Sequence, residues 1–149
     1  MTITLYWEQL KKDIDQITYR LSSSIENQEI KDDASADGLD FSTTFWRRNI
    51  MDGIAALKVR LADKLTAYTG NADDTLDTSS SWVFDLDIEE DSKAIAELMH
   101  RFVLYYALKA WALDYMPDAR KSIGDDYAEA MDGIEELSYK RRPPVKGQR

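Results

Sequence analysis

The sequence predicts a mainly α-helical domain with a four-helix, bundle-like arrangement, one extended arm or short strand, and a flexible basic C-terminal tail. Three observations lead to this fold class. Apolar residues recur at helical spacing in three segments, and a fourth segment is apolar on nearly all sides. Apolar residues alternate in one short segment near residue 85, which is typical of a strand. The last ten residues are basic and have no apolar face to bury.

The first helix is expected to run from about residue 4 to the high twenties. Its apolar residues follow one another by three or four positions, so that they share one side of a helix. They are Trp7, Leu10, Ile14, Ile17, Leu21 and Ile25. Residues 31–42 have no periodicity and are rich in Asp, Ser and Ala, which predicts a linker.

A second helix is expected to start at a cap formed by Thr43 or Thr44. Its apolar residues are Ile50, Ile54, Leu57, Leu61, Leu65 and Tyr68. Gly70-Asn71 then provides the left-handed stop with which many helices end. These features predict one continuous helix up to Tyr68.

Residues 71–91 are expected to form an extended arm that contains a short strand. Trp82, Phe84, Leu86 and Ile88 alternate along it, and a period of two predicts a strand. A lone strand leaves its backbone N–H and C=O groups unpaired, so it needs a partner. The sequence offers no second convincing strand, so we expect the partner in a neighbouring copy and interpret these four residues as interaction residues.

Two further helices are expected on either side of Pro117. The third begins after a cap at Asp91 or Ser92, and its apolar surface at 102–107 predicts a position at the centre of the bundle. Pro117 ends this helix and suits the first turn of the fourth, which ends near Tyr139. The apolar face of the fourth helix is expected to consist of Ile123, Tyr127, Ala130, Met131, Ile134 and Leu137.

The chain of 149 residues suits one domain at 1–140, followed by a tail at 141–149. The net charge is −9, but the last ten residues carry +5, so residues 1–139 carry −14. This charge opposes general binding to duplex DNA. The tail residues expected to contact a partner are Arg141, Arg142, Lys146 and Arg149. A docking arm and a solvated end are equally compatible with this tail.

Targeting signals and a membrane span are not expected. The N-terminal segment lacks the basic and apolar regions of a signal peptide. The most apolar stretch, Phe102 to Met116, has 15 residues and is interrupted by Lys109 and Asp114, which makes it too short and too charged to cross a bilayer. The sequence therefore predicts a cytoplasmic protein.

Two groups of residues carry the candidate chemistry. Glu97 and His100 match half of a di-iron bundle site, which needs two such motifs, and the chain has one histidine. Asp85, Asp87 and Glu89 share one face of an extended segment but lack the glycine and the final glutamate of a calcium loop. We therefore expect no metal, no cofactor and no catalytic residue, and a structural or solvated role for His100. Nucleophile-elbow and phosphate-loop motifs are absent, so the chain is not expected to be an enzyme.

Aromatic residues are expected mostly in the core. Four tryptophans in a small chain are nevertheless notable, because tryptophan is enriched at interfaces. We therefore expect one or two of Trp7, Trp46, Trp82 and Trp111 to contact a partner.

The second half of the chain has a recurrent order of elements. A long helix at 94–114 is rich in Tyr, Leu and Ala, and it is followed by the joint Tyr115-Met-Pro-Asp-Ala119. Tyr127-Ala-Glu-Ala130 and the basic end Arg141-Arg142-Pro143 complete the pattern. Over about residues 82–145 this pattern resembles the small helical adaptor or neck proteins of tailed-phage head–tail connectors. The first helix and its linker do not align with that family, and the pattern contains no catalytic fingerprint.

This resemblance implies a non-enzymatic structural subunit. Proteins of that family form homo-oligomeric rings that join the portal to the tail and pass DNA as non-specific cargo. The implied partners are further copies of the chain and the portal and tail proteins, and a free monomer before assembly is compatible with this role. The arm would reach a neighbour or the portal, and the protein would move from the host cytoplasm into the virion.

Two other functions remain open at this point. One is an acidic regulatory or inhibitory module that occupies the basic nucleic-acid-binding surface of a partner. The other is a metal-dependent enzyme that uses the carboxylates near 85–91 together with His100.

Overall fold

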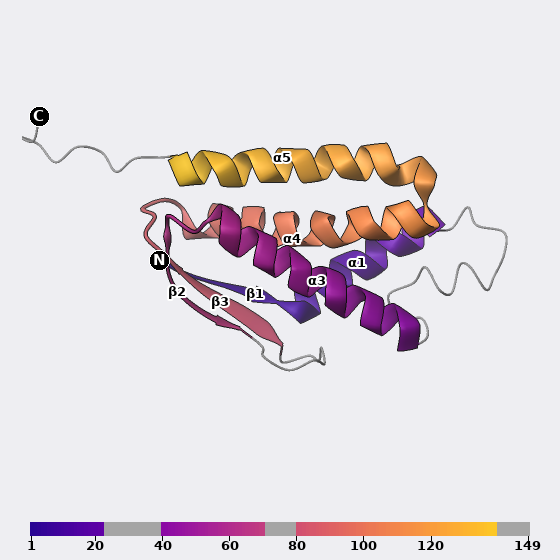
Figure 1. Cartoon of the computed structure of the whole chain (residues 1–149), viewed down its shortest axis with the longest axis horizontal. Helices are drawn as coiled ribbons and strands as arrows, with labels where there is room; N and C mark the ends of the chain where they lie inside the picture. The colour runs from indigo at the N-terminus through magenta and orange to yellow at the C-terminus, as the bar shows by residue number, and fades with distance from the viewer. Residues whose placement is uncertain (23–39, 71–79, 140–149) are drawn as a thin grey trace, which may run out of the picture.

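The computed structural model describes residues 1–22, 40–70 and 80–139. In chain order the elements are β1 (Thr2–Tyr6), α1 (Trp7–Ser22), α3 (Asp40–Arg60), β2 (Leu65–Gly70), β3 (Ser81–Leu86), α4 (Ser92–Tyr115), the short 3-10 turn η1 (Pro117–Ala119) and α5 (Arg120–Tyr139). The predicted mainly α-helical class is confirmed, with a small sheet added to the helices. Helix α4 lies between α5 on one side and the sheet on the other (Figure 1).

The sheet has three antiparallel strands in the order β1-β3-β2. Phe84 in β3 lies opposite Ile3 in β1 and opposite Tyr68 in β2. The strand predicted from the alternation at 82–88 is therefore present, and it is the central strand of the sheet. Its partners are in the same chain, so the expectation of an unpaired arm is wrong.

Helix α4 forms the centre of the fold, as its apolar surface predicted. Asp91 caps it through a hydrogen bond of 3.0 Å from the Lys93 backbone N–H to the carboxylate. Helices α1, α3 and α5 and strand β1 all contact α4. The helix ends at Tyr115, just before Pro117. Its buried residues are Ile95, Met99, Phe102, Val103, Leu104, Ala107, Leu108, Trp111 and Ala112.

Helix α5 packs on α4 through the predicted face. Ile123, Ala130, Ile134 and Leu137 are buried, and Tyr127 and Met131 pack against them while partly exposed. The ring of Tyr127 lies 5.4 Å from that of Phe102 and 5.9 Å from that of Tyr106, both on α4. Aromatic pairs in this range add roughly 0.5–1.5 kcal/mol each beyond the area they bury.

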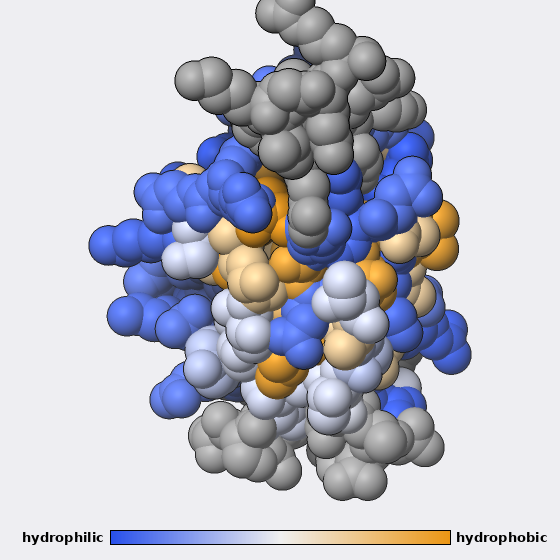
Figure 2. Space-filling model, turned by 90° about the vertical axis from the view of Figure 1, so that its left-hand side faces the viewer, coloured by the Kyte–Doolittle hydropathy of each residue, from blue (hydrophilic) through white to orange (hydrophobic). Residues whose placement is uncertain are grey.

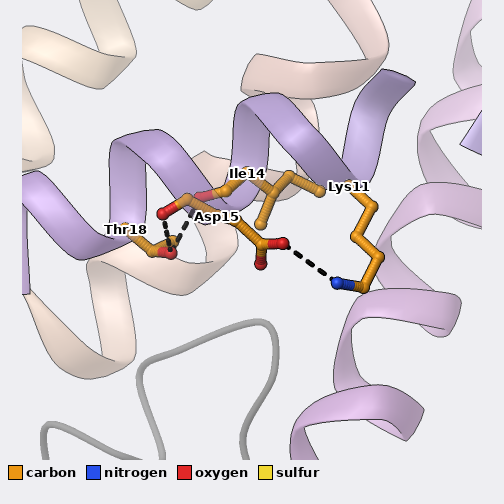
Figure 3. Close-up of polar contacts among 4 residues, drawn as sticks. All are labelled: Lys11, Ile14, Asp15 and Thr18. Atoms are coloured by element: carbon orange, nitrogen blue, oxygen red, sulfur yellow. Dashed lines mark hydrogen bonds and ion pairs between the residues drawn. The ribbon is translucent and has the colours of Figure 1, made fainter. Parts of the chain in front are cut away.

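Helix α1 buries the expected residues Leu10 and Ile14, together with one polar side chain. Thr18 is fully buried, and its hydroxyl donates a hydrogen bond of 2.7 Å to the Ile14 carbonyl, so burial leaves the hydroxyl paired (Figure 3). Lys11 and Asp15 form an ion pair of 2.9 Å between successive turns of the same helix. Such partly exposed pairs contribute little to stability.

Two segments predicted as helix are strands. Residues 2–6 form β1, although the first helix was expected from about residue 4, and residues 65–70 form β2, although the second helix was expected to reach Tyr68. Both segments are rich in Thr and aromatic or branched residues, which suit a strand. Pairing with β3 on both sides outweighs the helical spacing of Leu65 and Tyr68.

The start of α3 also differs from the prediction. The helix begins at Asp40, so Thr43 and Thr44 lie within it and the predicted linker 31–42 ends earlier. Residues 31–39 and the extension of the first helix beyond Ser22 lie outside the described residues. The apolar face of α3 is as predicted, because Ile50, Ile54 and Leu57 are buried.

Gly124 provides a test of the α5 geometry. A Cβ at this position meets nothing within 4 Å, so alanine fits without strain. Gly124→Ala is expected to raise the free energy of unfolding by about 0.5–1 kcal/mol, because alanine favours helix and restricts the unfolded chain. Urea denaturation measures this change.

Gly53 in α3 is the matched control. A Cβ there lies 3.3 Å from the ring of Tyr106, so contact with α4 offsets the gain in helix propensity. A gain at Gly53 as large as that at Gly124 contradicts the packing of α3 on α4.

Candidate functional site: free strand edge and adjoining groove

The apolar residues expected to contact a partner through β3 belong to the core. Trp82 and Phe84 are 0% exposed and Leu86 is 2% exposed. Ile88, two residues beyond the strand, is partly buried against the same core. The prediction that this strand adds to a neighbouring copy is therefore wrong, because both of its edges are paired within the chain.

The four tryptophans, of which one or two are expected to contact a partner, all lie in the core of the chain. Trp7, Trp46, Trp82 and Trp111 are all buried, with at most 7% of any of them exposed. The other predicted interaction residues, Arg141, Arg142, Lys146 and Arg149, lie outside the described residues, as does the part of the arm at 71–79.

A groove of about 490 Å³ runs beside strand β1. Thr4 and Leu5 of β1 form one side. Helix α1 contributes Gln9, Lys12, Asp13 and Gln16, and helix α4 contributes Ala96, Glu97 and His100. Its size falls within the range of ligand-binding grooves. The polar side chains of two helices thus lie next to an edge strand.

His100 is the most buried titratable residue in this groove. Its Nε2 atom lies 2.6 Å from Oδ2 of Asp13, and the two side chains are 16% and 40% exposed. The pair joins α4 to α1 across 87 positions of sequence. A structural or solvated role is expected for His100, and this contact supports the structural alternative; the sequence does not identify Asp13 as the partner.

The carboxylates near residue 85 do not converge with His100. Asp85 accepts a hydrogen bond from the Thr2 hydroxyl, and Asp91 is occupied as the cap of α4. Within residues 1–22, 40–70 and 80–139, no three acidic or histidine side chains are grouped closely enough to hold a metal ion. The described residues therefore do not form the metal-dependent arrangement of residues 85–91 with His100.

A second groove of about 400 Å³ lies where α1, α4 and α5 meet. Its lining includes Ile17 and Leu21 of α1, Tyr105 of α4, and Ile123 and Asp126 of α5. Burial raises the pKa of the Tyr105 hydroxyl above its ordinary value, and the nearby Asp126 carboxylate adds to this rise. The tyrosine therefore stays neutral and keeps its proton for hydrogen bonding at physiological pH.

The solvent-facing side of α5 carries a stripe of carboxylates. Asp125, Glu129, Asp132 and Glu136 are all exposed and follow one another by three or four residues. They lie opposite the apolar face that packs on α4. We call these four residues the α5 acidic stripe.

Apolar side chains are also visible at one end of the molecule. Figure 2 looks onto the end where α5 finishes and shows apolar groups between hydrophilic ones. Met1 lies beside Leu86 because the Leu86 N–H donates a hydrogen bond to the Met1 carbonyl. Leu65 lies opposite Leu86 in the register of β2 and β3. Both are partly buried against the core, as is Ile88.

No protein-family model, curated protein or solved structure matches this chain. Among the described residues, no helix has the length and apolar character needed to cross a membrane.

Sequence reasoning did not find the free edge of β1 or the groove beside it. The alternation of Ile3 and Leu5 with Thr2, Thr4 and Tyr6 was an available signal for a strand. The helical stripe that begins at Trp7 immediately afterwards favours a helix over the same residues.

The contact between His100 and Asp13 is open to a double-mutant cycle. With His100→Ala and Asp13→Ala, we expect a coupling energy of about 1 kcal/mol, because a hydrogen bond to a carboxylate is strong but Asp13 is partly exposed to water. Urea denaturation of the four proteins gives this value.

The pair Lys11 and Asp15 in the same helix is the control. Its coupling is expected to be smaller, at most about 0.5 kcal/mol, because the pair links neighbouring turns at the surface. A coupling near zero for His100 and Asp13, or one below that of the control pair, contradicts a role in joining α1 to α4.

Proposed function

We propose that the chain is a non-enzymatic structural subunit of a tailed-phage head–tail connector. In this proposal, copies of the chain assemble into a ring that joins the portal to the tail and through which DNA passes. The protein is made in the host cytoplasm and ends in the virion.

The observation that carries the proposal is the order of elements over residues 81–139. A strand leads into the long helix α4, and a three-residue turn at Pro117–Ala119 joins α4 to α5. This is the order of helix, short joint and helix on which the resemblance to connector adaptors rests. Helix α4 contacts elements on several sides, which suits a subunit whose role is to hold its shape in an assembly.

Charge supports the same role. The net charge of −9 disfavours adhesion to the DNA that passes through a ring, because like charges repel. The last ten residues carry +5, and the α5 acidic stripe offers four exposed carboxylates. In the proposed ring, the tail of one subunit binds the stripe of the next, which gives a head-to-tail contact.

The α5 acidic stripe also favours a second candidate function. A row of carboxylates at helical spacing can bind lysine and arginine side chains on a nucleic-acid-binding protein. The chain would then be an acidic inhibitory module that competes with nucleic acid.

Electron microscopy of the full chain mixed with the portal complex from the same genome tests the proposal. We expect a ring of additional density beneath the portal. Deleting residues 141–149 is expected to weaken binding by about tenfold or more, because the tail contact is electrostatic. Absence of added density at several salt concentrations contradicts the connector role, and binding of a basic nucleic-acid-binding protein instead supports the second candidate.

Two charge variants test where the tail binds. Glu129→Gln with Asp132→Asn neutralises the centre of the α5 acidic stripe and is expected to weaken assembly as the tail deletion does. Asp52→Asn with Asp63→Asn removes the same charge from exposed positions elsewhere and is expected to leave assembly unchanged. Equal effects of the two variants contradict tail binding at the stripe without contradicting the connector role.

A further inference from the structure

Strand β1 has one edge paired with β3 and one edge that no described strand covers. Met1 and Leu86 exchange two backbone hydrogen bonds, of 2.8 and 3.1 Å, and the Trp7 N–H donates to the Ser80 carbonyl at 3.0 Å. In an antiparallel pair, every second residue bonds to the partner strand. Ile3 and Leu5 therefore bond to β3, and the N–H and C=O groups of Thr2, Thr4 and Tyr6 point away from it.

The residues of β1 itself lack the features that usually prevent edge strands from pairing. Natural edge strands are often interrupted by charges, prolines or bulges. Strand β1 contains only Thr, Ile, Leu and Tyr, in a chain of which 32% is charged. The other edge strand, β2, has an irregular register between Leu65 and Ala67. Among the described strands, β1 is thus the edge with a regular register, and its own residues include no charge or proline.

A groove lies beside the outer edge of β1. The groove of about 490 Å³ borders Thr4, and on α1 it is lined by Gln9, Lys12, Asp13 and Gln16. Glutamine side chains both donate and accept hydrogen bonds. The glutamines of α1 beside the groove can therefore form hydrogen bonds with the same residues of a second copy. Tyr6, at the end of the strand, is 46% exposed and offers an aromatic ring to a neighbouring strand.

We infer that β1 binds β1 of a second copy of the chain in an antiparallel pair centred on Thr4. With Thr4 opposite Thr4, Thr2 lies opposite Tyr6 of the second copy. The outward residues of this five-residue strand are spaced equally on either side of Thr4. Every outward N–H and C=O group therefore finds a partner, and two three-stranded sheets become one continuous sheet.

The second copy is the occupant that this edge fits best. Only an extended polypeptide presents donors and acceptors at the two-residue repeat of a strand edge. In the register centred on Thr4, the outward groups of β1 pair with the same groups of a second copy related by a two-fold axis. The residues of the strand are uncharged, so the strands do not repel each other at this axis. This contact closes at two copies and does not depend on the connector role, whose ring needs a head-to-tail contact.

Sedimentation equilibrium of the full chain tests the dimer. The mass is expected to rise with concentration from 17.1 kDa towards twice that value. Thr4→Lys places two ammonium groups near the axis and is expected to weaken dimerisation by about tenfold or more. Thr4→Pro removes the outward N–H while the bonds of Ile3 and Leu5 to β3 remain, and it is expected to have the same effect.

Thr69→Lys is the matched control, because it places the same charge at an exposed position on the other edge strand. It is expected to leave the dissociation constant unchanged. Circular dichroism checks that each variant is folded. If Thr4→Pro disturbs the strand, Thr4→Lys still tests the inference, because lysine keeps the backbone N–H. A wild-type mass of one copy up to about 1 mM, or equal effects of Thr4→Lys and Thr69→Lys on the dissociation constant, overturns the inference.

Amide hydrogen exchange at two concentrations gives the residue-level result. The amides of Thr2, Thr4 and Tyr6 are expected to slow at high concentration, whereas those of Ile3 and Leu5 are slow at both. Exchange at Thr2, Thr4 and Tyr6 that does not change with concentration contradicts the β1 pair even if the chain dimerises.

Discussion

The burial of β3 between two strands and against the helices is the constraint on which the rest of the structure depends. Trp82, Phe84 and Leu86 fill the side of the sheet that faces the core, and each contributes roughly 1.5–3 kcal/mol by leaving water. Strand β3 can occupy this position only if both of its edges are paired, since buried backbone groups must be hydrogen-bonded. The chain meets this requirement with segments from residues 2–6 and 65–70. Helix α4 then covers the sheet and carries α5 on its other side.

Local patterns were sufficient for much of the fold. The cap at Asp91, the stop before Pro117 and the apolar face of α5 each depend on residues close together in sequence, so the sequence predicts them. Strands β1 and β2 depend instead on pairing with a distant segment. Thr2 bonds to Asp85 across 83 positions, and no local period reports such a contact. Leu65 also lies four residues after Leu61, which made β2 look like a continuation of α3.

The candidate site was predictable only in part. One histidine and no cysteine argued against a multi-histidine metal site, and the single histidine is paired with Asp13 at 2.6 Å. The identity of that partner and the groove beside β1 follow from the crossing of α1, α4 and β1, which sequence periodicity does not specify. Function is harder to predict from the sequence than the fold or the site, because a fold of helices on a small sheet supports many roles. The connector proposal therefore rests on the order of elements after residue 80 and on the separation of charge between body and tail.

Native-state hydrogen exchange of β3 tests the central claim most directly. Since Trp82, Phe84 and Leu86 bond towards β1, the amides of Val83 and Asp85 bond towards β2. A central strand predicts slow exchange at both sets of amides, with opening free energies close to those of core amides in α4. Fast exchange at Val83 and Asp85 while α4 stays protected would mean that β3 is not held on its β2 side. Fast exchange along the whole strand would mean that residues 81–86 form an unpaired arm, and it would contradict the central position of β3 in the sheet.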